Sequence, residues 1–530
     1  MLGSPSGKPM TRLTDIDDFA TAQQACTSAA LWALFDGDRE YMNLAHECLD
    51  RHRARGTAVS VKSADGGLEH LAFGALADDA SRFAHWLAAR GVGPGERVAV
   101  MLEPGRAFYA CMFGAIKAGA IAVPLFTLFG PDGLALRLDD CKPRVLIADA
   151  EGARLGANRR DLLVVTPNAA FWDELAALPA AHTPRTRADS LAVFQYTSGT
   201  TRELPEAVRH TQRSVVTLMV AALYGVGLRP GDRYFCPSSP AWGHGLWHGT
   251  IAPLALGVHV GAYAGKFDPA RLYDALIELD IDNFAAAATV YRMLRNSGVT
   301  EGRPHTLRKC SFTGEPLDPD TFDWIERTFG VAPASMYGTT EVGVIMLDYP
   351  GMRGHRVKRG ALGKPAPGNE VAILDEAGQP LGDDVIGEIA VKRRGEWFRV
   401  KDFGRRDAEG YYYHAGRADD VIISAGWTMS AVEIENVLLT HPAVAEAAVI
   451  GVPDPLRGQI AKACIVARAG HALDVPALQD YMKDRLAKHE YPRAVELVSE
   501  LPKTPAGKIN RKALRDQARA AAAQDQTGAS

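Results

Sequence analysis

The sequence lacks the features that mark several common classes of protein. Its seven cysteines are scattered, with the closest two, Cys26 and Cys48, 22 residues apart, so neither a zinc site nor a disulfide framework is predicted. A net charge of -4 over 530 residues gives no electrostatic footprint for nucleic acid. The Walker A pattern and the GxSxG elbow are missing, which argues against a P-loop nucleotidase and a serine hydrolase.

A membrane segment and a secretory signal are also missing from the pattern. Residues 1–15 are polar and contain no apolar core of a signal peptide. The longest apolar stretch, residues 108–129, is interrupted by Lys117 and Pro124, which predicts a buried helix followed by a buried strand. An odd number of unpaired cysteines fits a reducing compartment, so we expect a cytoplasmic protein.

What the sequence does contain is an alternation of helical and strand patterns, which predicts layered parallel α/β structure. The texture changes to short strands with turns over residues 361–399, which indicates a small β-rich subdomain. A final unit of mixed α+β pattern follows. The expected helices are 73–91, 133–140, 430–440 and 476–488, and the expected strands are 96–102, 144–150, 192–196, 445–452 and 461–468.

Five short motifs occur in a fixed order along the chain. Together they resemble the adenylate-forming acyl-CoA synthetases, in particular the medium-chain branch, although each string alone is common in proteins. The resemblance covers most of the chain, up to Lys508. The motifs are YTSGTT (196–201), GEP (314–316), YGTTE (337–341), GRADD (416–420) and LPKTPAGKINRKALR (501–515).

The resemblance implies both a domain plan and a reaction. It implies an N-terminal adenylation domain over residues 16–418 and a small, mobile C-terminal lid domain over 419–517, with disordered ends at 1–15 and 518–530. The implied reaction joins a carboxylate to ATP, giving an acyl-adenylate and pyrophosphate. Coenzyme A then displaces AMP to give the acyl-CoA thioester. ATP, Mg²⁺ and coenzyme A are therefore the expected cofactors and co-substrates.

The first motif lies in a loop that could cradle phosphate oxygens with hydroxyls and successive backbone amides. The family grips the β- and γ-phosphates here and usually continues with glycine and a Pro-Lys pair. This chain instead has an arginine and no lysine in the loop, and the arginine could supply the missing cation. The loop residues are Thr197, Ser198, Gly199, Thr200, Thr201 and Arg202.

The second and third motifs are expected to surround the adenine and the α-phosphate. The tyrosine face of Tyr337 can stack on a purine, and the carboxylate of Glu341 can hold Mg²⁺. By resemblance Thr340 hydrogen-bonds the α-phosphate, so Thr340 and Glu341 count as catalytic. The other implied contacts are Gly314, Glu315, Pro316, Gly338 and Thr339.

Asp402 and Arg417 are separated by the offset at which the family binds the ribose. One carboxylate can accept hydrogen bonds from both ribose hydroxyls, and Arg417 would reach the ribose or a phosphate. The chain reads VKD at Asp402, where the family usually has TGD. The resemblance also makes Asp419 the hinge between the two domains and Gly426 a coenzyme A contact, with Thr428 at a common arginine position.

Lys508 is the expected catalytic lysine, carried on the lid by the Gly-Lys pair of the last motif. The first step brings a carboxylate anion against a polyanion, and negative charge builds on the leaving pyrophosphate. An ammonium group at the reacting oxygens, together with Mg²⁺, stabilises that charge.

The segment AWGHGLWHG (241–249) resembles the wall of the family's acyl pocket, which Trp242, Gly245 and His248 would line. His244 and His248 are four residues apart, a spacing that also occurs in zinc sites. The glutamate of the HExxH pattern is missing, because Gly245 stands there, so packing or substrate contact is the better interpretation.

Three questions stay open at this point. The acid is expected to be short to medium in length, branched or a small ring, but its identity is not readable. The acceptor could be a carrier-protein thiol in place of coenzyme A. A nucleotide- or acyl-binding protein with reduced turnover is the third hypothesis, prompted by the altered loop after Thr201 and by Thr428. The oligomeric state cannot be inferred.

Overall fold

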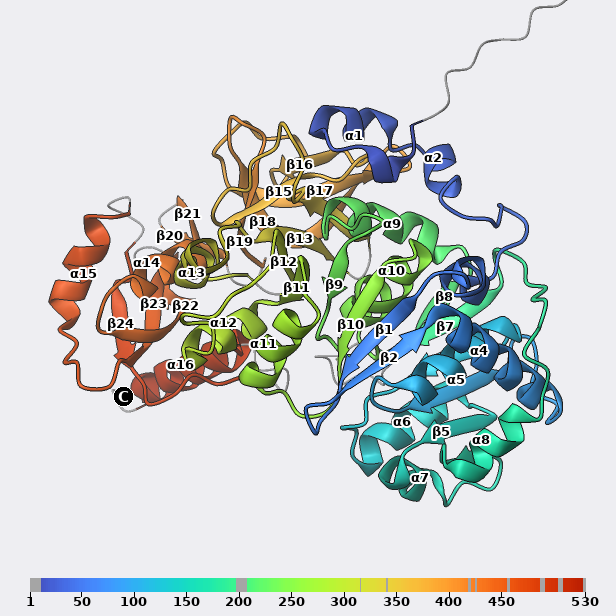
Figure 1. Cartoon of the computed structure of the whole chain (residues 1–530). Helices are drawn as coiled ribbons and strands as arrows, with labels where there is room; N and C mark the ends of the chain where they lie inside the picture. The colour runs from blue at the N-terminus through green and yellow to red at the C-terminus, as the bar shows by residue number, and fades with distance from the viewer. Residues whose placement is uncertain are drawn as a thin grey trace, which may run out of the picture.

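The computed structural model describes residues 11–196, 207–314, 316–339, 342–417, 421–424, 427–454, 458–486, 491–503 and 509–527. The chain forms a large region (residues 11–417) and a small region (residues 421–527). In Figure 1 the small region, drawn in orange to red, lies at one end of the molecule. A blue to teal α/β layer lies at the opposite end. This mixed α/β architecture confirms the predicted fold class.

That α/β layer is built on a six-stranded sheet with the order β6-β5-β3-β4-β7-β8. Five strands are parallel and β8 is antiparallel to β7, so the sheet is mainly of the predicted parallel kind. The predicted helix-then-strand reading of 108–129 is confirmed by α5 and β4. The strands are β3 Arg97–Met101, β4 Ile121–Pro124, β5 Val145–Ala148, β6 Leu163–Val165, β7 Leu191–Gln195 and β8 Val208–Thr211.

A second sheet of thirteen strands crosses the middle of the large region, in the order β16-β17-β18-β19-β15-β14-β13-β12-β11-β9-β10-β1-β2. The six strands from β13 to β1 are parallel, whereas β14 to β19 are antiparallel and form the predicted β-rich part. The parallel strands are β1 Thr57–Lys62, β9 Arg233–Phe235, β10 His259–Tyr263, β11 Asn283–Ala287, β12 Lys309–Thr313 and β13 Ala334–Thr339. The others are β2 Leu68–Ala72, β14 Gly343–Leu347, β15 Ala361–Pro365, β16 Val371–Leu374, β17 Gly387–Arg393, β18 Glu396–Arg406 and β19 Tyr412–Arg417.

Helices fill the space between the two sheets and cover their outer faces, because each apolar face must be buried against another layer. The main core lies between the sheets and includes α3, α4, α5, α9 and α10. Helices α6 and α7 cover the outside of the six-stranded sheet, and α11 to α13 cover the outside of the thirteen-stranded sheet. The helices are η1 Leu13–Asp15, α1 Phe19–Ala25, α2 Ser28–Trp32, α3 Leu44–Cys48, η2 Asp50–His52, α4 Phe73–Ala88, α5 Arg106–Lys117, α6 Pro131–Cys141, α7 Ala150–Gly156, α8 Ala169–Ala176, α9 Ser214–Tyr224, the π-helix η3 His244–Ile251, α10 Ala252–Ala255, α11 Pro269–Glu278, α12 Ala288–Ser297 and α13 Pro319–Phe329.

The small region has its own sheet and its own core. Strands β21-β20-β23-β22 form a sheet to which β24 adds a parallel edge at β23. Helices α14 and α15 pack on one face, and α16 packs on the other. The elements are β20 Val421–Ser424, β21 Trp427–Ser430, α14 Ala431–Leu439, β22 Val444–Asp454, β23 Gly458–Ala467, α15 Val475–Lys483, β24 Ala494–Leu497 and α16 Arg511–Thr527.

Both ends of the chain contain helical structure where disorder was predicted. Residues 11–15 contain η1, whose Leu13 is buried in the main core. Helix α16 continues to Thr527, beyond the predicted start of the tail at 518, because its alanine run has a high helix propensity. Within the described parts of the chain, none of the helices is both long and apolar enough to span a bilayer.

Candidate active site

The predicted site residues that the structure describes gather where parallel strands end. Strands β13, β12, β11 and β9 run side by side in one direction, so their carboxyl ends meet at one edge of the sheet. Gly314 follows β12 at this edge, Tyr337 to Thr339 close β13, and Cys236 follows β9. Ligands of open α/β sheets bind outside the carboxyl ends of their strands, so this edge is the candidate site.

Asp402 and Tyr337 meet across the boundary between the parallel and antiparallel strands. The Tyr337 hydroxyl donates to Asp402 Oδ2 at 2.5 Å, and Asp402 is only 8 % exposed. Arg417 lies directly opposite Asp402 in the register of β18 and β19. His414 Nε2 lies 3.9 Å from Asp402 Oδ1. The contact therefore joins two predicted nucleotide residues that are 65 positions apart in the chain.

The backbone next to Asp402 has an unusual conformation. Lys401 has a φ of 63°, in the left-handed region that non-glycine residues seldom adopt. This is the position where the resembling family usually has glycine, so the lysine adopts a conformation suited to the residue it replaces. Such conformations cost about 1–3 kcal/mol and cluster at functional sites.

The turn after Tyr337 has no room for a side chain at its glycine. A Cβ atom on Gly338 would lie 2.2 Å from the carbonyl oxygen of Gly343, so only glycine allows β13 and β14 to approach this closely. The Thr339 Oγ1 is buried without a hydrogen-bond partner among the described residues. Gly314 and Pro316 occupy the turn between β12 and α13, as expected for the second motif.

Many of the predicted site residues lie outside the described residues, and for these the roles remain predictions. They include the whole phosphate loop, the catalytic residues, the hinge and one coenzyme A contact. The residues are Thr197, Ser198, Gly199, Thr200, Thr201, Arg202, Glu315, Thr340, Glu341, Asp419, Gly426 and Lys508.

The predicted acyl-pocket segment folds as the π-helix η3, a rare form that is frequent at functional sites. Its backbone is packed tightly against the preceding turn: a Cβ atom on Gly245 would lie 2.1 Å from the Ser239 carbonyl oxygen. Gly245 is thus required for packing. Trp247 Nε1 donates to Gln195 Oε1 at 3.0 Å. Because Gln195 ends β7, this hydrogen bond holds η3 beside the end of that strand.

Three polar side chains lie near His244, namely Ser238, Cys236 and His248. His244 Nδ1 is 3.0 Å from Ser238 Oγ and 3.8 Å from Cys236 Sγ. Burial raises the pKa of the Cys236 thiol, but the neighbouring His244 outweighs this effect and the pKa is lowered. The His248 ring lies 6.0 Å from the His244 ring, and burial together with His244 lowers the pKa of His248 to about 3. His248 is therefore neutral at pH 7.

Trp242 lies at the surface end of the same segment. Its side chain is 41 % exposed, and its ring packs edge-on against Phe126 at 5.4 Å. Phe126 follows β4, the strand next to β7 in the six-stranded sheet. The aromatic pair therefore extends the apolar wall from η3 toward that sheet.

The predicted magnesium site cannot be built from the described residues alone. No group of three or more His, Cys, Asp or Glu side chains in the described parts of the chain could hold a metal ion. The expected ligand, Glu341, lies outside those parts. The acyl-pocket histidines form no metal-binding group with the described residues around them.

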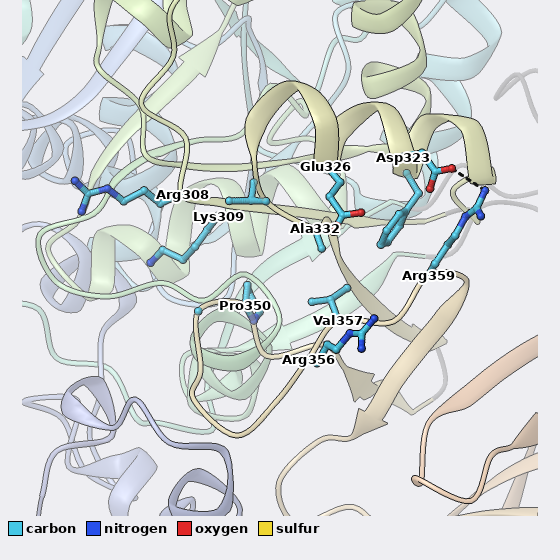
Figure 2. Close-up of a pocket in the computed structure, with 12 residues that line it drawn as sticks. Arg308, Lys309, Asp323, Glu326, Ala332, Pro350, Arg356, Val357 and Arg359 are labelled. Carbon is cyan, nitrogen blue, oxygen red and sulfur yellow. Dashed lines mark ion pairs between the residues drawn. The ribbon is translucent and has the colours of Figure 1, made fainter.

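A pocket of about 340 Å³ lies elsewhere in the large region and contains none of the predicted site residues (Figure 2). Lys309, at the amino end of β12, lines it, whereas the candidate site lies at the carboxyl end. In Figure 2 Asp323 and Arg359 face one another as an ion pair of 2.9 Å. Lys309 is paired with Asp232 at 2.7 Å, so much of the charge is compensated. We do not assign this pocket to the reaction.

Comparison with known proteins agrees with this arrangement. The AMP-binding enzyme family model matches residues 49–396, and the model of the AMP-binding enzyme C-terminal domain matches residues 433–508. The chain therefore belongs to the AMP-binding enzyme family and is an enzyme of its AMP-forming acyl-CoA ligase class.

Individual relatives cover nearly the whole chain. Acetyl-coenzyme A synthetase of Bacillus subtilis is 31 % identical over 520 residues, which span 89 % of this chain and 90 % of the relative. The Brucella canis acyl-CoA synthetase structure has a TM-score of 0.74 at 30 % identity and covers 95 % of this chain and 99 % of its own. The anthranilate CoA ligase AuaEII, solved with anthranoyl-AMP, has a TM-score of 0.79 at 27 % identity and covers 92 % and 99 %.

Sequence reasoning missed several side chains that the structure brings to this edge. Ser238 and Cys236 contact His244, Gln195 holds Trp247, and His414 faces Asp402. None belongs to a motif, because each contact depends on packing between strands or on the unusual path of η3. The one signal that could have indicated Cys236 and Ser238 was their position at the end of a strand pattern, eight and six residues before His244.

Proposed function

We propose that this enzyme activates a short- to medium-chain, branched or small cyclic carboxylic acid as its adenylate and transfers the acyl group to coenzyme A. The observation that carries the proposal is the contact between Tyr337 and Asp402 at the carboxyl edge of the parallel strands. Their pairing supports a purine nucleoside site, with the aromatic face for the base and the carboxylate for the ribose diol.

In this proposal the chain's own residues divide the work. The carboxylate of Asp402 accepts hydrogen bonds from the ribose, and in the structure the Tyr337 hydroxyl occupies one of its oxygens. Binding of the nucleotide would turn the tyrosine ring toward the base and free that oxygen. Lys508 would stabilise the charge that develops as the substrate carboxylate attacks the α-phosphorus and pyrophosphate leaves. Mg²⁺, held by Glu341, would neutralise further phosphate charge.

The second step exchanges one leaving group for another. The coenzyme A thiol, as its thiolate, attacks the acyl carbonyl, the bond to the phosphate oxygen breaks, and AMP leaves with its electron pair. Adenylation makes this possible because AMP is a far better leaving group than hydroxide. The range of acids is supported by two relatives: the Bacillus relative is named for acetyl-coenzyme A and AuaEII was solved with anthranoyl-AMP.

The test is a pyrophosphate-release assay on the purified full chain with ATP, Mg²⁺ and a panel of straight, branched and ring acids. We expect acid-dependent pyrophosphate release, followed by a thioester when coenzyme A is added. Asp402→Ala should raise the KM for ATP about ten- to a hundredfold, the size of a hydrogen bond to a charged group. Glu396→Ala, an exposed residue on the same strand, should leave that KM unchanged.

The alternatives give different outcomes in the same assay. Pyrophosphate release without a coenzyme A thioester would favour an enzyme that loads a carrier protein. No pyrophosphate with any acid would contradict the proposal and favour a binding protein with reduced turnover. All seven cysteines are free thiols, which supports a reducing, cytoplasmic setting for the enzyme.

A further inference from the structure

The buried histidine on the second turn of η3 has no hydrogen-bond partner among the described residues. His248 is only 6 % exposed, and its Nδ1 is fully buried without a partner in the part of the chain that the structure describes. Its Nε2 is not among the fully buried atoms, and it too lacks a hydrogen bond within the described residues. Buried polar atoms are nearly always paired, so an unpaired one requires an explanation.

The tautomer of His248 follows from the two nitrogen environments. A neutral imidazole carries one N–H donor and one lone pair. Buried N–H groups without a partner are the rarest kind of unsatisfied group, so the sealed Nδ1 carries the lone pair. The proton is then on Nε2, on the part of the ring that is not sealed, where it can be donated.

The surroundings of His248 set the location and charge of this donor. It sits on the helix that Gln195 anchors beside the end of β7, and it lies one turn beyond His244, whose Nδ1 is engaged by Ser238. No described ion pair or hydrogen bond brings a charged side chain to either histidine ring. The donor is therefore neutral and suits a neutral oxygen better than a second carboxylate.

We propose that His248 Nε2–H recognises an oxygen on the acyl group of the substrate, so that the preferred acid carries a hydroxyl, carbonyl or ether oxygen beyond its carboxylate. This inference rests on the proposed function, because it assigns the substrate class of the same acyl site. A plain hydrocarbon acid would leave the donor unpaired in the complex, whereas the oxygenated acid pairs it.

The test compares matched acids that differ by one oxygen. The pairs are hexanoate with its hydroxyhexanoates, cyclohexanecarboxylate with its oxo derivatives, and benzoate with its hydroxybenzoates, the substituent being placed at each position in turn. For each pair the ratio of kcat/KM is measured by pyrophosphate release. We expect at least one oxygenated acid to exceed its parent about tenfold, the usual size of one neutral hydrogen bond.

Two variants of His248 make the test specific to one nitrogen. His248→Gln places an amide N–H near the original Nε2, and His248→Asn places one near Nδ1. We expect the glutamine variant to keep the preference and the asparagine variant to lose it. Because the readout is a ratio within one variant, a loss of rate common to both acids cancels.

The possible results separate the two proposals. If the wild-type enzyme releases pyrophosphate but favours the hydrocarbon acid in every pair, the inference about His248 is wrong and the proposed function stands. Equal ratios for the glutamine and asparagine variants also overturn it. If no acid supports pyrophosphate release, the proposed function itself fails, and the inference fails with it.

Discussion

The two regions of the molecule differ in how they hold their predicted site residues. In the large region, strand ends fix the site: Asp402 is buried and paired with Tyr337, and η3 is held by Gln195. In the small region the predicted catalytic residue, Lys508, directly precedes a short bridge between Lys503 and Ile509. The predicted binding residues thus sit on a packed framework, whereas the predicted catalytic lysine lies outside the described residues.

The contact between the regions is consistent with this division. Helix α14 packs beside β19, and Arg405 Nε lies 3.4 Å from Glu433 Oε1 across the junction. Polar contacts of this kind resemble those between domains that change their relative position. We propose that the large region binds the nucleotide and the acid, and that the small region supplies a charge at one step only.

The largest expected effect follows from removing that charge. Lys508→Ala should slow adenylation about a hundred- to a thousandfold, the usual loss for one preorganised charge-stabilising group. Thioester formation from supplied acyl-adenylate and coenzyme A should keep most of its rate, because no pyrophosphate leaves in that step. Separate assays of the two half-reactions measure both effects.

The control for Lys508 is a neighbouring cation without a predicted role. Lys512→Ala removes a lysine that is 80 % exposed and paired with Asp516 on the next turn of α16. The rates of both half-reactions should be unchanged in this variant. If Lys508→Ala slows both half-reactions equally, the small region does not supply its charge at one step only, and the comparison between the regions fails.

A smaller effect, on stability, should be confined to the small region. Arg511 on α16 forms two hydrogen bonds with Glu435 on α14, the shorter of 2.6 Å, and Glu435 also accepts from the Val449 amide. Arg511→Ala leaves this carboxylate without its guanidinium. We expect the free energy of unfolding to fall by about 3 kcal/mol. This is the low end for breaking a buried ion pair, because Arg511 is 23 % exposed.

Hydrogen exchange measured by peptide would show where Arg511 acts. Amides of β22 and β23 should exchange about a hundredfold faster in Arg511→Ala, while those of β3 and β4 in the large region should not change. The Lys512→Ala protein again serves as the comparison and should exchange like the wild type. Faster exchange in both regions would mean that they unfold as one unit.

The fold could be predicted from the sequence because its signals were local, whereas the site residues were predicted from the motifs. Helix 73–91 and strands 96–102 and 144–150 correspond to α4, β3 and β5, each with a clear apolar period and a turn residue at its end. The hydrogen bond between Tyr337 and Asp402 was not predicted, because no local pattern brings these residues together. The family resemblance implied only that both residues contact the nucleotide.

Other features could not be predicted because they depend on packing between distant segments. The π-helical path of η3 arises where Gly245 packs against the carbonyl of Ser239. The left-handed conformation of Lys401 arises beside irregular pairing of β17 and β18 near Glu388 and Phe403. The alanine-rich tail had the composition of a linker, yet its helix propensity and the burial of Leu514 against β22 and β23 made it helical.

The smallest expected effect, taken per pH unit, is on stability in acid, and it should appear in the large region first. Burial lowers the pKa of His52 to about 4 and that of His248 to about 3. Between an unfolded-state pKa of about 6.5 and these values, the unfolded chain binds more protons than the folded one. The free energy of unfolding should therefore fall as the pH falls, by about 1.4 kcal/mol per pH unit for each such histidine.

His52→Gln isolates one histidine that has no predicted role in the site. The His52 Nε2 lies 3.0 Å from the carbonyl oxygen of Ala255, and a glutamine amide can make the same hydrogen bond. The variant should lose its share of the pH dependence above pH 4, measured by urea unfolding with tryptophan fluorescence, since Trp427 alone lies outside the large region. His471→Gln, at an exposed position of the small region, should leave the slope unchanged. An unaltered slope in His52→Gln would show that the buried neutral histidines are not what makes the large region the acid-sensitive one.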